Sequence, residues 1–328
     1  MSLPPRAVLV HRRTELQELL ARHGTRGQAA FFLSSRGRRI EDVAARDDAV
    51  RSAITAVTSA IPAKWRRGMV ERADLPRFLF EPGDIVIAVG QDGLVANLAK
   101  YLSGQVVVGI NPEPSRNPGI LVPYPADAAP GLLAAAASPG AAEHADRLTM
   151  VQALTDDGQR LTALNEIYLG QASHQTARYT LTLPSGQAEV QASSGLIVCT
   201  GTGATGWGRS AWLERRSGLI LPAPAEHRLT WFVREAWPSP ATGTTYTEGD
   251  LAAHQALTLT VESDQLTLFG DGIEADAISV AWGQAARIEL ATQTLRLLRS
   301  ADIGRGSHRG SRGRPGGRQT QRRRTRQA

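Results

Sequence analysis

Short apolar runs alternate with helical patterns along the first third of the chain. Four of these runs have the length of buried strands: 7–11, 29–33, 84–89 and 105–110. Between them, apolar residues recur at steps of three and four, which predicts helices at 16–20, 50–61 and 94–102. Continuous apolar strands that alternate with helices are typical of a parallel sheet covered on both faces.

The pattern changes after residue 110. Residues 111–125 contain five prolines, which indicates a structured loop, and an alanine-rich helix is predicted at about 127–145. From residue 147 onward, apolar residues often recur at every second position, as in Tyr179, Leu181 and Leu183, which predicts strands. We therefore expect an α/β + β protein with three parts: a Rossmann-like α/β domain with a parallel sheet at 1–122, a β-rich domain at 123–302 and a disordered tail at 303–328.

Length and composition exclude several classes of protein. The 328 residues suffice for about two domains. No apolar stretch approaches the roughly 18 residues of a membrane helix, and no charged leader precedes a long apolar run, so we expect a cytoplasmic protein without membrane contact. The single cysteine, Cys199, excludes a disulfide scaffold and a cysteine-rich zinc site. The histidine spacing also predicts no protein-bound metal.

The net charge of +6 comes from the end of the chain. Residues 303–328 contain nine arginines and no acidic residue, and the remainder has 28 basic and 31 acidic residues, a net charge of −3. Such a tail is typical of weak, salt-dependent contact with nucleic acid or another polyanion. A solvated tail without a partner is an equally good interpretation.

The segment Gly90-Gln91-Asp92-Gly93 lies at the carboxyl end of a predicted buried strand and opens a predicted helix. Ligands bind at this end of open α/β sheets, and the N-terminus of a helix favours anions. Asp92 could hold Mg²⁺ or take a proton from an attacking hydroxyl. The alternative is a tight turn in which Asp92 caps the helix.

Two further segments offer carboxylates. Asn165 and Glu166 form a polar pair within the apolar segment 161–169, where burial costs free energy unless both side chains are hydrogen-bonded. Ribose hydroxyls would satisfy both of them; a glutamate that faces solvent at a strand end is the alternative. Asp271 precedes Gly272, which indicates an ordinary hairpin turn or a carboxylate placed on a turn for binding.

A glycine- and threonine-rich loop follows the predicted strand 195–198. Its glycines at 201, 203 and 206 fit the spacing G-x-G-x-x-G, but it lies in the β-rich half, and the lysine of a phosphate-binding P-loop is missing. A Rossmann oxidoreductase would also need an early fingerprint of this kind, and none is present. The loop is suited to surround a ribose or phosphate, and Trp207 could stack on a base.

Taken in order, these segments resemble the NAD kinase family, over roughly residues 6–298. The family's GGDGT motif is similar to 90–94, its strand and asparagine to 108–111, its Asn-Glu pair to 165–166, its Thr/Gly loop to 200–207 and its late Asp-Gly to 271–272. Within this family the sequence is most similar to the mitochondrial-type branch. The similarity lies in the acidic and proline-containing stretch 111–119, the loop 193–203 and the segment 232–235.

The resemblance implies an enzyme that transfers a phosphoryl group from ATP, or from polyphosphate, to the adenosine 2′-hydroxyl of NAD, with Mg²⁺. It implies an α/β domain and a β-rich domain with the substrate between them, in a homodimer or larger oligomer. Asp92 matches the family's catalytic aspartate. The binding residues that it implies are Gly90, Gly93, Asn165, Glu166, Thr202, Thr205, Gly206, Trp207 and Asp271.

Two positions depart from the motif. Gln91 replaces its second glycine, and Leu94 replaces its threonine. A side chain at 91 would crowd the nucleotide phosphates, and the loss of a hydroxyl at 94 removes one hydrogen-bond donor. A second hypothesis is therefore a non-catalytic NAD(P)-binding sensor, or a kinase for a related nucleotide, on the same fold.

Overall fold

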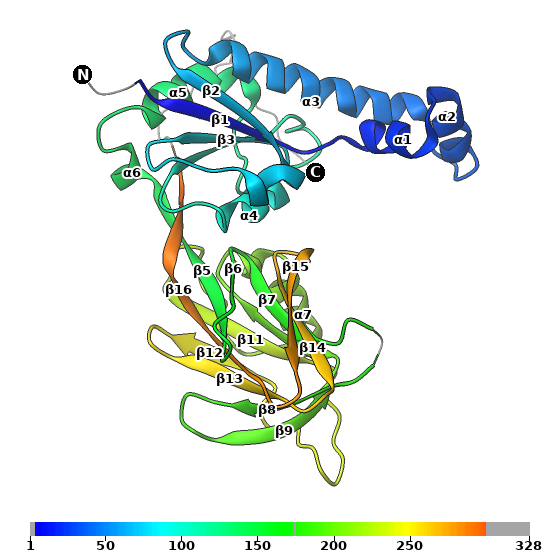
Figure 1. Ribbon diagram of the computed structural model, residues 1–328, viewed down its shortest axis with the longest axis vertical. Helices are drawn as coiled ribbons and strands as arrows, with labels where there is room; N and C mark the ends of the chain where they lie inside the picture. Colours follow the sequence, from blue (N-terminus) through cyan, green and yellow to red (C-terminus); the bar gives the residue numbers. More distant parts are fainter. Residues whose placement is uncertain (1–3, 174, 300–328) are drawn as a thin grey trace, which may run out of the picture.

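An α/β unit is followed by a β-rich unit, as the hydrophobic pattern predicts (Figure 1). The computed structural model describes residues 4–173 and 175–299. The predicted tail at 303–328 lies outside the described residues. Within the described part, the strands form a ten-stranded and a six-stranded sheet.

Parallel strands begin the ten-stranded sheet, in the order β2-β1-β3-β4. Their bounds are Arg6–His11 for β1, Arg66–Glu71 for β2, Ile85–Val89 for β3 and Val106–Ile110 for β4. Strands β3 and β4 are buried along their whole length because helices cover both faces. α3 (Ile40–Ala60) and α5 (Ala129–Ala136) pack on one face, and α4 (Asp92–Ala99) packs on the other.

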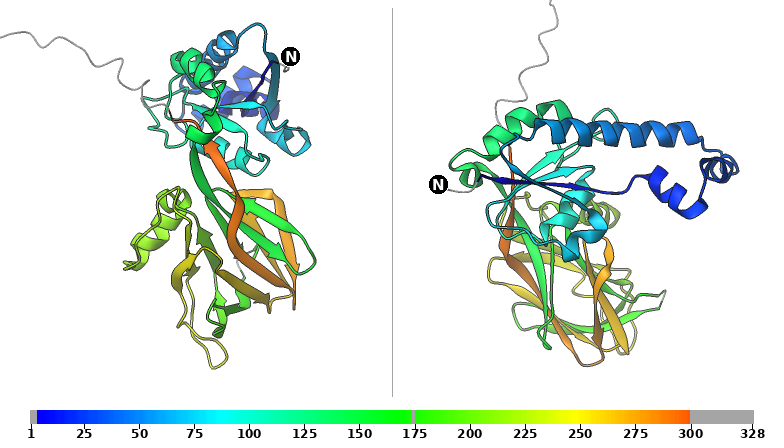
Figure 2. Two further views of the ribbon diagram at one scale, coloured as in Figure 1. Left: turned by 90° about the vertical axis from the view of Figure 1, so that its left-hand side faces the viewer. Right: turned by 45° about the horizontal axis from the view of Figure 1, so that its top comes forward.

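Three helices form an arm that projects from the α/β unit (Figure 2). α1 (Glu15–His23) begins with a capping box formed by Thr14 and Gln17. The predicted strand at 29–33 is wrong, because this segment lies in α2 (Arg26–Ser34). The Thr25 hydroxyl accepts a hydrogen bond from the backbone N–H of Gln28 at 3.2 Å and starts the helix. Ala29 and Leu33 then face α1 and α3, a helical spacing that a five-residue run does not reveal.

Two other local predictions are corrected. Strand β2 was not predicted, because it is an edge strand in which only Val70 is buried, so it carries no apolar run. The prediction of a single helix at 127–145 is wrong. It is divided into the 3-10 turn Ala126–Ala128, α5 and α6 (Ala141–His144), since Pro139 and Gly140, with φ of 81°, interrupt it.

The β-rich unit contains two sheets that pack face to face, with their apolar side chains between them. The ten-stranded sheet supplies β5 (Asp146–Thr155), β6 (Arg160–Ala163), β8 (Ala177–Thr182), β9 (Ala188–Ser193), β13 (Ala256–Val261) and β16 (Ala285–Leu297). The other sheet has the order β12-β11-β10-β7-β14-β15. Its bounds are Glu166–Gly170 for β7, Gly195–Cys199 for β10, Arg228–Arg234 for β11, Glu248–Ala252 for β12, Gln265–Gly270 for β14 and Ile273–Ala281 for β15. α7 (Trp207–Arg215) covers its outer face (Figure 2).

Strand β16 joins the two units. Most of it pairs antiparallel with β5 and β13, and its residues Arg296 and Leu297 pair in parallel with β4. A second contact is the ion pair between Lys100, which follows α4, and Asp276 of β15. These contacts hold the tip of the β14–β15 hairpin against α4, next to the carboxyl ends of β1 and β3 (Figure 1).

Candidate functional site

The chain reverses its direction of winding between β1 and β3. From β1 the chain leads to β2 on one side, whereas from β3 it leads to β4 on the other. In open α/β sheets, ligands bind at the carboxyl end of the strands at such a reversal. The residues that follow these two strands, Arg12–Thr14 and Gly90–Gln91, therefore mark the expected binding position.

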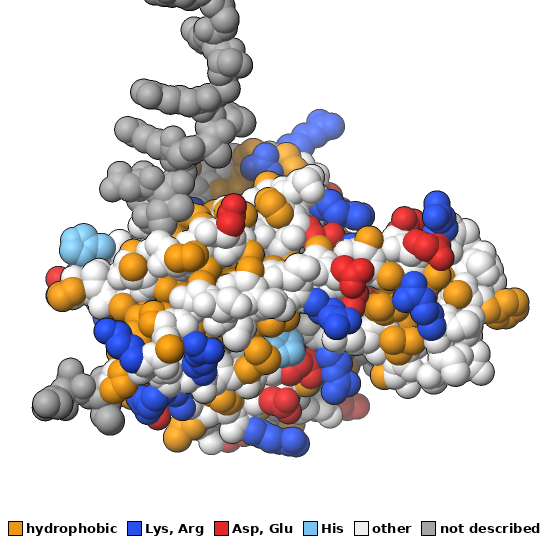
Figure 3. Space-filling view, turned by 90° about the horizontal axis from the view of Figure 1, so that it is seen from above, with side chains coloured by type: hydrophobic (Ala, Val, Ile, Leu, Met, Phe, Trp, Pro, Cys, Tyr) orange, Lys and Arg blue, Asp and Glu red, His pale blue; other side chains and the backbone are white. Residues whose placement is uncertain are grey.

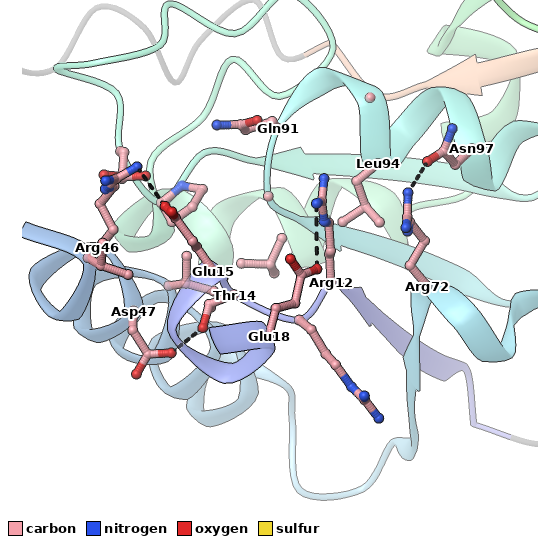
Figure 4. Close-up of a pocket in the computed structure, with 18 of the residues that line it drawn as sticks. Arg12, Thr14, Glu15, Glu18, Arg46, Asp47, Arg72, Gln91, Leu94 and Asn97 are labelled. Atoms are coloured by element: carbon pink, nitrogen blue, oxygen red, sulfur yellow. Dashed lines mark hydrogen bonds and ion pairs between the residues drawn. The ribbon is translucent and has the colours of Figure 1, made fainter. Parts of the chain in front are cut away.

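A cavity of about 480 Å³ lies at this position (Figure 4). Its wall includes Gly90 and Gln91 from the turn after β3, Gly93 from the first turn of α4, and Asp271 from the β14–β15 hairpin. Much of the remaining wall comes from the turn after β1 and from helices α1 and α3 of the arm, and Arg72, Asn97 and the segment 112–113 also contribute to it. Seen from above, basic and acidic side chains are interleaved where the arm meets the body (Figure 3).

The turn after β3 leads directly into α4. Gln91 is the N-cap residue, and among the described residues no side chain caps the helix. The alternative interpretation of Asp92 as the N-cap is therefore wrong, because Asp92 is the first residue of the helix itself. The first N–H groups of a helix have no partner within it, so an uncapped N-terminus at a cavity favours an anion.

The carboxylate of Asp92 faces the segment 120–122 and does not line the cavity. It accepts hydrogen bonds from the backbone N–H groups of Ile120, Leu121 and Val122 at 3.0, 2.8 and 3.2 Å. Gly109 of β4 supports the same segment, since a Cβ there would lie 2.0 Å from the Leu121 carbonyl oxygen. In this conformation Asp92 therefore anchors the segment 120–122 to the start of α4.

Asp271 connects the cavity with the Asn-Glu pair. With Gly272 it forms the predicted hairpin turn, with φ of 55° and 67°. Its carboxylate accepts hydrogen bonds from the backbone N–H groups of Leu164 at 2.9 Å and Asn165 at 2.6 Å. Burial raises the pKa of Asp271 to about 6, although these two donors act in the opposite direction. The hairpin thus places on the cavity wall a residue whose carboxyl group has a raised pKa.

Glu166 begins β7 and is only 8% exposed. Among the described residues its carboxylate has neither a hydrogen-bond nor an ion-pair partner. Burial raises its pKa to about 7, and the negative charge of Asp271 contributes to the rise. The side chain of Asn165 also lacks a hydrogen-bond partner in the described part of the chain. Two adjacent polar side chains are therefore left to bind something else.

The loop after β10 packs against this pair. The Thr200 hydroxyl donates to the carbonyl oxygen of Leu164 at 2.5 Å and accepts from the backbone N–H groups of Thr202 and Gly203. A Cβ at Gly203 would lie 2.1 Å from the carbonyl oxygen of Asn165, so only glycine fits. The Thr202 hydroxyl is buried without a partner among the described residues.

The end of the same loop lies further out. Thr205 and Gly206 are exposed, and the Thr205 hydroxyl donates to the carbonyl oxygen of Thr202 at 2.8 Å. Trp207 stacks on Tyr168, with ring centroids 5.4 Å apart and 23° between the planes. One face of the indole is therefore already occupied, which limits stacking on a base to what the rest of the ring offers.

The structure brings only some of the predicted site residues together. Gly90, Gly93 and Asp271 line the cavity, and Asp271 links them to Asn165 and Glu166. Asn165, Glu166 and Thr202 are not part of the cavity wall, and neither are the residues 205–207 or Asp92.

The cationic part of this wall was not predicted from the sequence. Arg12, Arg13, Arg46 and Arg72 all line the cavity. The pair at 12–13 could have been found, since it directly follows a predicted buried strand. Arg72 lies in the 3-10 helix Arg72–Arg77, and its guanidinium donates to the Asn97 side-chain oxygen at 3.3 Å.

Comparison with known proteins adds no assignment: no protein-family model matches this chain, and no curated protein matches it significantly. Within the described ranges, no group of three His, Cys, Asp or Glu side chains could hold a metal ion. No helix of the described residues is long and apolar enough to cross a membrane. The NAD kinase resemblance therefore rests on the order of the motifs and on the positions of their residues.

Proposed function

We propose that this protein is an NAD(H) kinase-like phosphotransferase that moves a phosphoryl group from ATP or polyphosphate to the adenosine 2′-hydroxyl of NAD. The observation that carries the proposal is the position of Asp271. This residue lines the cavity with Gly90 and Gly93, and its carboxylate binds the backbone of Asn165. Three motifs far apart in sequence thus meet at one place, in the manner that the resemblance implies.

The donor phosphates would bind at the uncapped N-terminus of α4, where N–H groups and Arg72 supply positive charge. The acceptor ribose would bind at Glu166 and Asn165, whose side chains lack partners among the described residues. Phosphoryl transfer depends mainly on the positioning and charge stabilisation that such groups provide. Mg²⁺ takes phosphate oxygens and water as ligands, so we propose that it enters with the nucleotide and not on a protein cluster.

Two carboxylates are candidates to take the proton of the attacking hydroxyl. Asp92 has the role that the resemblance implies, and it would have to exchange its backbone donors at 120–122 for the substrate. Asp271 lies on the cavity wall, and its pKa of about 6 suits a general base near neutral pH. We keep Asp92 as the catalytic residue and treat Asp271 as the competing assignment.

A second function, NAD(P) binding without catalysis, is favoured by one observation. The exposed side chain of Gln91 lies on the cavity wall beside Gly90, and Asp92 is engaged elsewhere. For either function we propose a cytoplasmic protein that assembles as a homodimer or larger oligomer.

The test is formation of NADP or NADPH by the purified protein with Mg²⁺, ATP and either NAD or NADH. Asp92→Asn should lose turnover. The matched control is Asp157→Asn, which alters a carboxylate that also accepts several hydrogen bonds but lies on the β5–β6 turn. Turnover retained in Asp92→Asn would transfer the catalytic role to Asp271. Absence of product in the unchanged protein, with measurable NAD binding, would favour the sensor.

A further inference from the structure

The two ends of the cavity at the β1–β3 reversal differ in chemistry (Figure 4). At one end lie the start of α4 and Arg72, which has no carboxylate partner among the described residues. Its hydrogen bond goes to the neutral side chain of Asn97. A guanidinium without a counter-ion and the N-terminus of a helix, both on the wall of one cavity, suit a phosphate group.

The other end is formed by the arm, and its charges are already paired. Arg46 lies 3.4 Å from the carboxylate of Glu15, which also binds Arg38 at 2.6 Å. Asp47 is buried and accepts a hydrogen bond from the Thr14 hydroxyl. Figure 4 shows these side chains opposite Arg72.

Two valines complete the arm end of the cavity. Val50 of α3 adds a partly exposed apolar side chain to its wall, and Val43, which is only 1% exposed, adds little. This end therefore offers carboxylate acceptors and an apolar face, but no unpaired positive charge among the described residues. These are the features that a ribose and a base require, because hydroxyl and amino groups donate hydrogen bonds and a base presents a flat apolar face.

The charges on the cavity wall distinguish a nucleoside triphosphate from polyphosphate as the phosphoryl donor. Among the described residues it contains four arginines and five carboxylates. Inorganic polyphosphate carries negative charge along its whole length, so at the arm end it would meet Glu15, Glu18 and Asp47. A nucleoside triphosphate places its charge at one end only, and the volume of about 480 Å³ is within the usual range for such ligands.

We propose that the arm end of the cavity, at Val43, Arg46 and Val50, binds the nucleoside half of the phosphoryl donor. The donor is then a nucleoside triphosphate and not polyphosphate. This assignment rests on the proposed function, because it takes the start of α4 as the phosphate end.

The test measures binding without turnover, by calorimetry with ATP and with inorganic tripolyphosphate. Val50→Trp fills the arm end and leaves the Arg72 end open; Val50→Phe makes a smaller change. The matched control is Ser52→Trp, which places the same side chain on an exposed face of α3 away from the cavity.

The unchanged protein should bind ATP roughly tenfold more tightly than tripolyphosphate, a difference of ~1.4 kcal/mol. The Val50 variants should lose that advantage while tripolyphosphate binding stays the same, which also shows that they are folded. Equal affinities in the unchanged protein, or equal losses for both ligands, would overturn the proposal. ATP binding with this pattern but without NADP formation would refute the proposed function alone.

Discussion

Replacement of Glu166 by glutamine tests the description of the buried site. Glu166 is 8% exposed, and burial raises the pKa of its carboxyl group from the ordinary 4.5 to about 7. At about 1.4 kcal/mol for each pH unit, that rise corresponds to ~3 kcal/mol by which the ionised form destabilises the folded protein. Glutamine has a similar shape and no charge, so it removes this destabilisation.

The sign of the effect depends on pH. Between pH 4.5 and 7 the folded protein retains a proton that the unfolded chain has released, so this group makes stability fall as pH rises across that window. Above pH 7 this loss of stability is complete and no longer changes with pH. Glu166→Gln should therefore exceed the unchanged protein in free energy of unfolding by up to ~3 kcal/mol at pH 8, and by little at pH 4.5 or below.

The assay is urea unfolding at pH 4.5 and pH 8 for the unchanged protein and the variant. Glu226→Gln is the control, because Arg228 lowers the pKa of that exposed carboxyl group and its loss should give no gain at pH 8. A Glu166→Gln variant that is no more stable than the unchanged protein at pH 8 would refute the reasoning. The variant should also bind NAD roughly tenfold more weakly, since a hydrogen bond to a charged group contributes ~1.5–3 kcal/mol.

Four further predictions follow from the site and the tail. Gly109→Ala should lower the free energy of unfolding by ~1–3 kcal/mol in urea, because its Cβ would lie 2.0 Å from the Leu121 carbonyl oxygen; an unchanged midpoint would contradict this. Asp92→Asn should lower the free energy of unfolding by ~2 kcal/mol and speed hydrogen exchange at the three amides that bind its carboxylate. Unaltered exchange would contradict the conclusion that Asp92 anchors the segment 120–122. Gln91→Gly should strengthen ATP binding in calorimetry, and no change would show that the side chain does not crowd the phosphates. Deletion of 303–328 should reduce retention on DNA at low salt; equal retention would leave the tail without this role.

The fold class was predictable because periodicity reports burial directly. Strands β3 and β4 are covered on both faces, so they form continuous apolar runs that the sequence displays. The segment 29–33 was wrongly predicted as a strand, because its apolar residues pack within the arm and not in a sheet. The edge strand β2 could not be predicted from the hydrophobic pattern, because only one of its residues, Val70, is buried.

The candidate site was predictable only in part. Motif spacing placed Gly90, Gly93 and Asp271, because a strand end or a tight turn leaves a local signature in the sequence. The direction of a side chain leaves none, so the sequence did not reveal that Asp92 faces the segment 120–122. The arginines of the wall come from segments that meet only through the order of the strands, and Arg72 belongs to no motif.

The measurement that tests the central claim most directly is the fate of the γ-phosphoryl group of labelled ATP. The protein is incubated with Mg²⁺, labelled ATP and NAD, and the product is separated and its phosphorus resonances are recorded. The account predicts transfer of the label to NAD and a new 2′-phosphate monoester resonance, both lost in Asp92→Asn. Label that remains in ATP while NAD is bound, or that appears at another position of the dinucleotide, would contradict the account.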